Sequence, residues 1–157
     1  MCTKSETIIS EMDVLSTQIE ARKNASNKQI LEQISNKNHS LKSISITECH
    51  VISSIASEEP MNGIGISNKT GLTRGAISKI TTSLIKKGLI TSYQDGVNKK
   101  KIFYKLTPLG EIVNQIHSEE HQKINRAIIN EVDKYTEQEQ EVILKFIQNL
   151  QDFFNKR

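Results

Sequence analysis

Apolar residues recur at helical spacing at both ends of the chain, and polar residues fill the positions between them. The first series consists of Ile8, Ile9, Met12, Leu15, Ile19, Ile30, Leu31 and Ile34. The last series consists of Val142, Ile143, Phe146, Ile147, Leu150, Phe153 and Phe154. Thr136 and Glu139 form a capping box just before this last series. Residues three and four positions apart share one helix face, so both ends are predicted to form long amphipathic helices.

A further long helix is predicted from Pro108 to beyond Ile128. Thr107 and Pro108 are a typical cap and first-turn pair. The apolar positions that follow are Ile112, Val113, Ile116, Ile124 and Ile128. Helices this apolar on one face, joined to so small a middle segment, need a partner to bury that face. The flanks are therefore predicted to form a homodimer with two-fold symmetry.

The centre of the chain is built from shorter elements. Thr47 is predicted to cap a helix that Pro60 ends. The stretch "GIGISNKTG" then forms a short helix closed by glycine, and Thr73 caps a second helix that ends at Gly88. Two short helices joined by a tight glycine turn form a helix-turn-helix pattern.

A hairpin is predicted directly after these helices. "LITSYQ" and "KIFYKLT" are rich in β-forming residues, and "DG" between them favours a tight turn. A helix-turn-helix followed by a hairpin is a winged helix. The predicted fold is mainly α with a small β-hairpin wing, in a single domain over 1–157. Its winged helix-turn-helix lobe covers 45–110, and dimerisation helices cover 1–40 and 111–157.

Charge is distributed unevenly along the chain. Between Gly63 and Gly110 there are nine basic residues and one acidic residue, which gives this segment a charge of +8. The rest of the chain holds 12 basic and 17 acidic residues, so the formal net charge is only +3. All seven glycines lie in the same basic segment. A turn-rich, strongly positive centre predicts binding to a polyanion such as double-stranded DNA.

The helix after Thr73 is predicted to have two different faces. The apolar face consists of Ala76, Ile77, Ile80 and Leu84. The opposite face is small, hydroxylic or cationic, and its candidate DNA contacts are Arg74, Ser78, Lys79, Thr82 and Lys86. Lys99, Lys100 and Lys101 follow the hairpin turn and are candidate phosphate contacts. An ordinary solvated face is the alternative interpretation.

The stretch "GLTRGAISKITTSLIKKGLI", the basic hairpin and "KLTPLG" together resemble the core of MarR-family transcriptional regulators. The resemblance extends over about 45–115 and implies a dimeric regulator that binds a palindromic operator with two recognition helices. Members of this family usually carry an Asp-x-Arg pair that braces the wing. The matching positions here are Asn98 and Lys100, so the sequence lacks that ion pair.

Two of the four histidines, His117 and His121, lie four positions apart. They are at the edge of the apolar stripe of the helix predicted to begin at Pro108. This spacing lets two imidazoles reach one metal ion. For the pair alone, surface or packing histidines are the alternative interpretation.

The sequence is also similar to the zinc-responsive AdcR/ZitR-like branch of the MarR family. That branch binds zinc with a glutamate on the first helix, a histidine on the second and an H-x-x-x-H pair on the fifth. The matching residues are Glu32, His50, His117 and His121. The resemblance implies a Zn²⁺ site and a zinc-dependent repressor of zinc-uptake genes. A second, weaker metal site of that branch would have only His39 and Cys49 here.

Other functions remain open on the sequence alone. Within the same fold, a small organic ligand could release the protein from DNA, and the histidines would then line its pocket. A thiol-oxidation sensor would depend on Cys2, which is at the terminus, or on Cys49, which has no obvious cation neighbour. A metal-dependent hydrolase would need a general base, for which Glu119 and Glu120 qualify only by proximity. No catalytic motif accompanies them, so we predict that the protein is not an enzyme.

The opening "MCTKSETIIS" lacks the apolar run of a signal peptide, and no segment approaches the roughly 20 apolar residues of a membrane span. Two cysteines are too few for a disulfide framework. A cytoplasmic protein that does not contact a membrane is therefore expected.

Overall fold

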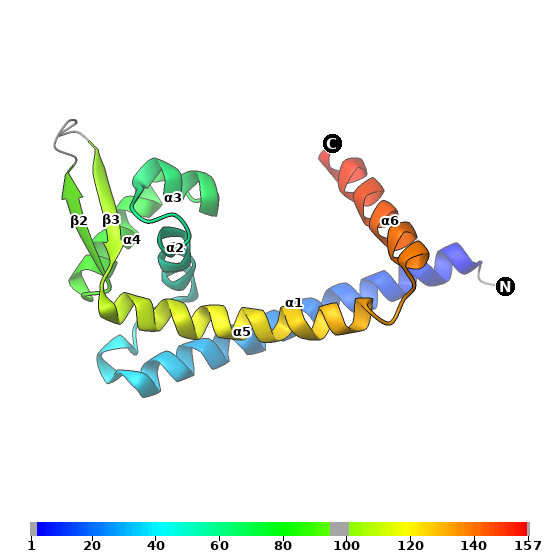
Figure 1. Ribbon diagram of the computed structural model, residues 1–157, viewed down its shortest axis with the longest axis horizontal. Coiled ribbons are helices and arrows are strands. Elements are labelled where there is room, and N and C mark those ends of the chain that lie inside the picture. The colour runs from blue at the N-terminus through cyan, green and yellow to red at the C-terminus, as the bar shows by residue number, and fades with distance from the viewer. Residues whose placement is uncertain (1–2, 95–100, 157) are drawn as a thin grey trace. The chain divides into compact units, whose positions relative to one another are not determined.

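The computed structural model describes residues 3–94 and 101–156. Its elements are α1 (Lys4–Lys37), the 3-10 helix η1 (His39–Leu41), α2 (Ile46–Ala56), β1 (Met61–Asn62), α3 (Gly63–Thr70), α4 (Arg74–Lys86), β2 (Ile90–Gln94), β3 (Ile102–Leu106), α5 (Pro108–Val132) and α6 (Glu137–Asn155) (Figure 1). The predicted fold class, mainly helical with a small antiparallel wing, is confirmed. The chain divides into two compact units, Met1–Glu120 and His121–Arg157, and the boundary falls inside the continuous helix α5.

Side-chain caps set where the helices of the lobe begin and end. Thr73 Oγ1 accepts a hydrogen bond from a backbone N–H of the first turn at 3.3 Å, as predicted for α4. The predicted cap Thr47 is wrong, because it lies inside α2 and Ser45 caps that helix. Ser45 and Glu48 form a capping box, in which each side chain accepts from the other's backbone N–H. Gly71 ends α3 with a φ of 72°, a left-handed conformation that favours glycine.

The core of the first unit collects apolar side chains from five helices. Its largest fully buried members are Ile30, Ile34, Leu41, Val51, Ile52, Ile55, Ile66, Ile77, Leu84, Leu89, Ile90 and Val113. They come from the α-helices α1, α2, α3, α4 and α5, from η1, and from the start of β2 and the residue before it. Burying one side chain of this size stabilises the folded state by about 1.5–3 kcal/mol. Because the cluster includes side chains of α3 and α4, it fixes the orientation of the helix-turn-helix.

The sheet has three antiparallel strands in the order β1-β3-β2. β2 and β3 form the predicted hairpin, and they lie side by side in Figure 1. β1 is an addition that the sequence pattern does not predict, because two residues carry no periodicity. Met61 of β1 pairs with Tyr104 of β3. This short strand attaches the start of α3 to the wing and makes the helix-turn-helix and the hairpin one lobe.

The second unit contains the end of α5 and the whole of α6. α6 begins at the predicted capping box of Thr136 and Glu139, and none of its residues is buried. Its exposed large apolar residues are Val142, Ile143, Leu144, Phe146, Ile147, Phe153 and Phe154. The predicted amphipathic helix is present, and its apolar face is uncovered in the single chain. No helix in residues 3–94 and 101–156 combines the length and the apolar character needed to cross a membrane.

Gly110 packs against the backbone of Leu89 at the start of α5. A Cβ atom at position 110 would overlap the Leu89 carbonyl oxygen and press on Leu106 Cβ at 3.4 Å. We expect Gly110→Ala to lower the free energy of unfolding by about 2–3 kcal/mol, because backbone has to move. Urea unfolding followed by circular dichroism measures this change. Gly75→Ala is the matched control, since its Cβ would meet open space. It should be neutral or stabilising by up to about 1 kcal/mol, and equal losses would contradict the packing argument.

Candidate metal centre and nucleic-acid interface

α4 turns one face to the core and the other to solvent. Ile77 and Leu84 are buried, as predicted, and Thr81 is buried with them. The five candidate DNA contacts of this helix are all exposed: Arg74, Ser78, Lys79, Thr82 and Lys86. No acidic residue occurs between Arg74 and Lys86. The helix therefore offers a small, hydroxylic and cationic surface that can approach a nucleic acid closely.

A buried ion pair attaches the end of α4 to the start of α2. Lys87 Nζ lies 2.7 Å from both carboxylate oxygens of Glu48. The two side chains are only 18% and 7% exposed. Ser83 Oγ donates to the same carboxylate at 2.7 Å, and Lys87 also donates to the Ser43 carbonyl at 3.2 Å. One carboxylate thus holds two side chains at the C-terminal end of α4.

The Glu48 carboxyl is ionised in this environment. Burial raises its pKa, but hydrogen bonds from Lys87, Ser45 and Ser83 and the charge of Lys87 together outweigh burial. The pKa therefore lies below its ordinary value of 4.5. Removing one partner of such a pair is costly, because the other charge stays buried without compensation.

The wing supplies a cation to the side of the lobe on which the exposed face of α4 lies. Lys101 is exposed immediately before β3. Lys99 and Lys100, the other two predicted phosphate contacts, lie outside the described residues, as does Asn98. The predicted absence of the Asp-x-Arg brace therefore stays a prediction from the sequence.

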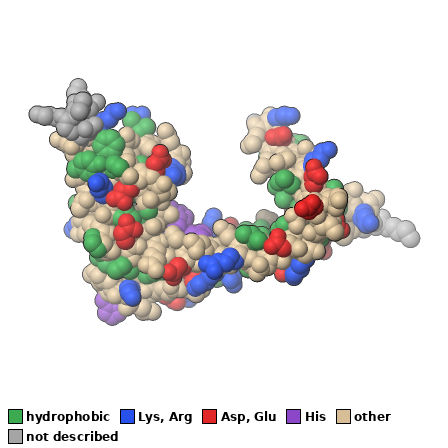
Figure 2. Space-filling view, viewed as in Figure 1, with side chains coloured by type: hydrophobic (Ala, Val, Ile, Leu, Met, Phe, Trp, Pro, Cys, Tyr) green, Lys and Arg blue, Asp and Glu red, His purple; other side chains and the backbone are tan. Residues whose placement is uncertain are grey.

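An aromatic pair braces the described part of the wing. Tyr93 of β2 and Phe103 of β3 pair across the strands and stack, with ring centroids 5.9 Å apart. Lys105 Nζ lies 5.3 Å from the centroid of the Tyr93 ring. Figure 2 shows hydrophobic side chains at the surface over the wing strands, with Lys or Arg side chains close by. Cross-strand aromatic pairs stabilise a hairpin by roughly 0.2–1 kcal/mol, so the wing has a brace of its own.

Three of the four predicted metal ligands come together. One ring nitrogen from each of His50, His117 and His121 lies within 4.8 Å of the other two. His50 belongs to α2, and the other two occupy successive turns of α5. The His50 and His117 rings meet edge to face, with centroids 5.2 Å apart and an interplanar angle of 70°. His117 is 5% exposed, and the other two histidines are exposed.

The donor chemistry of this group fits a metal ion of borderline hardness. Imidazole nitrogens bind Zn²⁺ at about 2.0–2.1 Å, so two ligands of a tetrahedral ion lie about 3.4 Å apart. Nitrogens within 4.8 Å of one another can meet around one ion by small side-chain rotations. Three imidazoles leave one position of a tetrahedral ion for another ligand.

Glu32, the fourth predicted ligand, lies apart from the histidine group. Its carboxylate is 3.9 Å from Lys28 Nζ, and its side chain is 62% exposed. The cause is the rotation of α1, because Ile30 and Ile34 are buried in the core and Glu32 falls on the opposite side. Within the described residues, the three histidines are the one group of metal-capable side chains that gathers in this way.

The two residues of the predicted second metal site have different surroundings. His39 is exposed in η1, where its Nδ1 lies 3.2 Å from the Ser35 carbonyl oxygen. Cys49 is fully buried, and burial together with the nearby Glu48 charge raises the pKa of its thiol to about 12. A thiol with so high a pKa is a poor metal ligand and a poor target for oxidation. Cys2 lies outside the described residues.

The sequence analysis does not predict a structural role for two buried carboxylates near these sites. Glu48 is one, and the Ser45-x-x-Glu48 spacing of a capping box was the available signal. Glu120 is the other, at 5% exposure. Its Oε1 accepts hydrogen bonds from Gln33 at 3.2 Å and from Gln29 at 3.5 Å, which links α5 to α1. Its helical spacing from Val113 and His117 places it in the buried row.

The lobe and its exposed cationic helix define a winged helix-turn-helix protein with a metal-capable histidine group. The family model described as MarR family matches residues 44–102. Over these residues, which contain the helix-turn-helix and strands of the wing, the chain is similar to the MarR family.

Individual relatives agree with this family. HTH-type transcriptional regulator PchR of Bacillus subtilis (strain 168) is 38% identical over 105 residues, which cover 67% of this chain and 62% of PchR. Transcriptional regulator AdcR of Streptococcus pneumoniae is 25% identical over 101 residues, 64% of this chain and 68% of AdcR. Lactococcus lactis ZitR in complex with DNA is 26% identical with a TM-score of 0.64, over 71% of this chain and 76% of ZitR. ZitR is described as a zinc-responsive MarR family member. The chain spans less than two thirds of the length of PchR.

The Glu48–Lys87 pair predicts a large effect of one substitution. Lys87→Met should lower the free energy of unfolding at pH 7 by about 3 kcal/mol, because it leaves the Glu48 carboxylate buried without its cation. Urea unfolding measures the change. Lys86→Met removes the adjacent, exposed lysine and should change stability by less than about 0.5 kcal/mol. Similar values for the two variants would contradict the assigned role of the pair.

Proposed function

We propose that this chain is a zinc-dependent transcriptional repressor of zinc-uptake genes that binds a palindromic operator in double-stranded DNA as a homodimer. The observation that carries the proposal is the three-histidine group. It joins α2 of the winged lobe to α5, so a ligand at this group acts on the helix that holds α4. The protein is proposed to be a regulator and not an enzyme, and PchR and AdcR, which are named as regulators, support this.

The DNA-binding part of the proposal rests on α4 and the wing. α4 would enter the major groove with its exposed Arg74, Ser78 and Lys79 toward the bases and phosphates. Lys101, with Lys99 and Lys100 of the same basic run, would reach the backbone beside the adjacent minor groove. ZitR, which has a similar fold and was solved in complex with DNA, supports this assignment.

The homodimer rests on the uncovered apolar residues of the long helices. α1 exposes Ile8, Ile9, Val14, Leu15 and Ile19, and α6 exposes seven large apolar residues. Apolar surface of this extent on a helix marks an interaction site, and an identical chain offers a complementary face by symmetry. Two copies would present two α4 helices to two half-sites of one operator.

Zinc is the metal that the donor set favours. His50, His117 and His121 would hold the ion, and Glu32 is the candidate for the fourth position after a change in its side chain or in α1. Bound, the ion supplies a cross-link between α2 and α5. The winged lobe would then be held at one angle to α5, and that angle sets the spacing of the two α4 helices. ZitR, described as zinc-responsive, supports zinc as the signal.

Release from DNA by a small organic ligand is the second candidate function. A cavity of about 570 Å³ favours it, where Gln33, Asn36 and Lys37 of α1 face Ile112, Gln115, Ile116 and Glu119 of α5. A ligand there would also bear on the junction between α1 and α5. This function predicts weaker DNA binding with the ligand, which is opposite in sign to the effect proposed for zinc.

Zinc is expected to raise operator affinity about 5–150-fold over that of chelator-treated protein, the usual range for coupling between two sites. A duplex selected from random sequence by the full chain serves as the operator, and fluorescence anisotropy measures its binding. Mn²⁺ is the control metal and should have less effect, because imidazole ligands suit zinc better than the harder manganese ion. Operator binding that zinc and chelator leave unchanged would refute zinc dependence.

Replacing His117 and His121 together with alanine should abolish the zinc response and leave the dimer intact. Both side chains are proposed ligands, and neither belongs to the apolar faces of α1 and α6. Calorimetric titration measures zinc binding, anisotropy measures the effect of zinc on DNA binding, and sedimentation measures the dimer. His39→Ala removes an exposed histidine outside the group and should behave like the unaltered chain. Loss of the dimer in the double variant would assign these histidines to packing.

Glu32→Gln separates a four-ligand site from a three-histidine site. If Glu32 completes the coordination, the neutral amide should weaken zinc binding by at least about 10-fold, since carboxylate oxygen is a far better zinc ligand than an amide. Glu20→Gln, on the same helix, is the control and should leave zinc affinity unchanged. If Glu32→Gln does not change the zinc affinity, the histidines and a ligand other than Glu32 hold the ion.

A further inference from the structure

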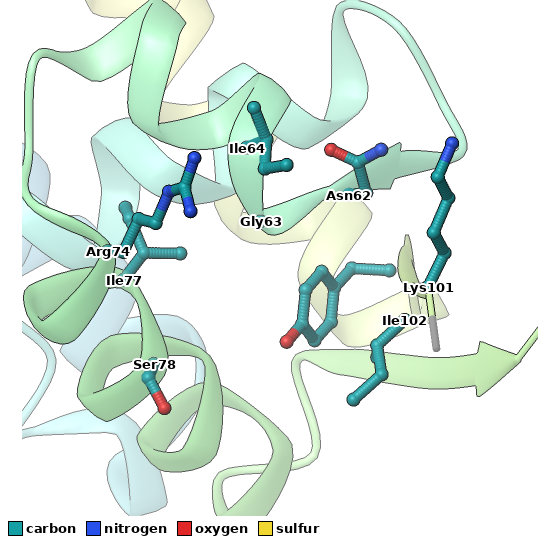
Figure 3. Close-up of a pocket in the computed structure, with 9 residues that line it drawn as sticks. Asn62, Gly63, Ile64, Arg74, Ile77, Ser78, Lys101 and Ile102 are labelled. Carbon is teal, nitrogen blue, oxygen red and sulfur yellow. The ribbon is translucent and has the colours of Figure 1, made fainter. Parts of the chain in front are cut away.

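A pocket of about 240 Å³ lies between the start of α3, the first turns of α4 and strand β3. Figure 3 shows Arg74 and Lys101 on opposite sides of this pocket, with Gly63 between them. The other lining residues are Asn62, Ile64, Ile77, Ser78, Ile102 and Tyr104. The lining thus contains two cations and no carboxylate. A concave surface of one charge sign concentrates the field and selects an anion.

The position of the pocket indicates which anion. In a winged helix the recognition helix lies in the major groove, and the wing lies at the adjacent minor groove. One strand of phosphodiester backbone separates these two grooves. The surface between α4 and the wing must therefore face that strand, and the pocket is located on this surface.

We propose that this pocket seats one phosphodiester group of the DNA strand that runs between the two grooves, an inference that rests on the DNA binding proposed above. Arg74 would donate paired hydrogen bonds to two phosphate oxygens, and Lys101 would add a point charge from the other side. Neither cation forms an ion pair with another residue of 3–94 or 101–156. Both remain available for a phosphate.

The rest of the lining suits the groups that flank a phosphate. Ile64 and Ile102 are 50% and 45% exposed, and they can contact the carbon atoms of deoxyribose. Asn62 caps α3, with its Oδ1 accepting from Gly65 N at 2.9 Å. Gly63 carries no side chain, so the phosphate can approach the first turn of α3 closely. The pocket therefore combines residues from three segments that are separate in the sequence, 62–64, 74–78 and 101–104.

Gly63 also provides a substitution that alters the pocket without disturbing the fold. A Cβ at this position would meet only Ile77 Cγ2, at 3.9 Å, which is an ordinary contact. Ile77 is itself part of the pocket wall. Gly63→Ala should therefore fold with an unchanged or slightly raised melting temperature, and it should place a methyl group where the phosphate would sit.

Single methylphosphonate groups in the selected duplex test the assignment, because each removes one phosphate charge. In the unaltered, zinc-loaded chain we expect one position in each half-site at which this change weakens binding by at least about 10-fold. Arg74→Ala, Lys101→Ala and Gly63→Ala should each bind more weakly and lose most of the sensitivity at that same position. Arg74→Ala and Lys101→Ala should be non-additive, because both act on one phosphate. Lys42→Ala, an exposed lysine outside the pocket, should keep full sensitivity.

The outcomes distinguish this inference from the proposed function. A chain that selects no duplex at all would refute DNA binding itself. A chain that binds DNA, but whose Arg74→Ala and Lys101→Ala variants keep the methylphosphonate sensitivity or lose it at different positions, would refute the shared phosphate seat. Inorganic phosphate is the second arm, added at constant ionic strength, and it should not displace the duplex. If inorganic phosphate displaces the duplex, and Lys101→Ala abolishes this displacement, the pocket would be reassigned as a site for a free phosphate ion.

Discussion

Three successive side chains of α2 connect the parts of the winged lobe. Glu48 holds Ser83 and Lys87 at the end of α4, Cys49 is fully buried in the core, and His50 places its ring 5.2 Å from that of His117 on α5. Consecutive residues of a helix point about 100° apart, which is why one 11-residue helix can serve three neighbours. The position of α4 relative to α5 therefore depends on α2. A ligand that binds His50 and α5 together acts on this same constraint.

The electrostatics of the lobe separate into an internal and an external set of charges. Of the nine basic residues between Gly63 and Gly110, Lys87 is used inside the lobe by Glu48, and Lys69 lies 3.9 Å from Glu58. Both acidic partners come from α2 or the loop after it, outside the basic segment. The exposed cations of α4 and the wing are the ones left for an external anion. The +8 charge of the segment thus overstates the charge that the surface offers, although its sign is right.

The apolar residues divide in a similar way. One set, from α1 to α5, is closed into the core of the first unit. The other set, on the N-terminal half of α1, the end of α5 and α6, is exposed in the single chain. Both sets have the same helical periodicity. Such periodicity shows that a helix face is apolar, but it does not show what covers that face. The proposed homodimer gives the second set a role that the single chain does not.

The sequence by itself determined the helices, the hairpin, the caps at Thr73 and Thr136, and the cationic face of α4. These features depend on local propensity and on residues a few positions apart. Only the tertiary structure decided the rotation of α1, since Ile30, Leu31 and Ile34 allow more than one buried face, and packing of Ile30 and Ile34 turned Glu32 to solvent. It also decided that Glu48 is an anchor for α4 as well as a cap, that β1 pairs with β3, and that Arg74 and Lys101 line one pocket. Each of these requires residues far apart in the chain to meet, and no local pattern carries that information.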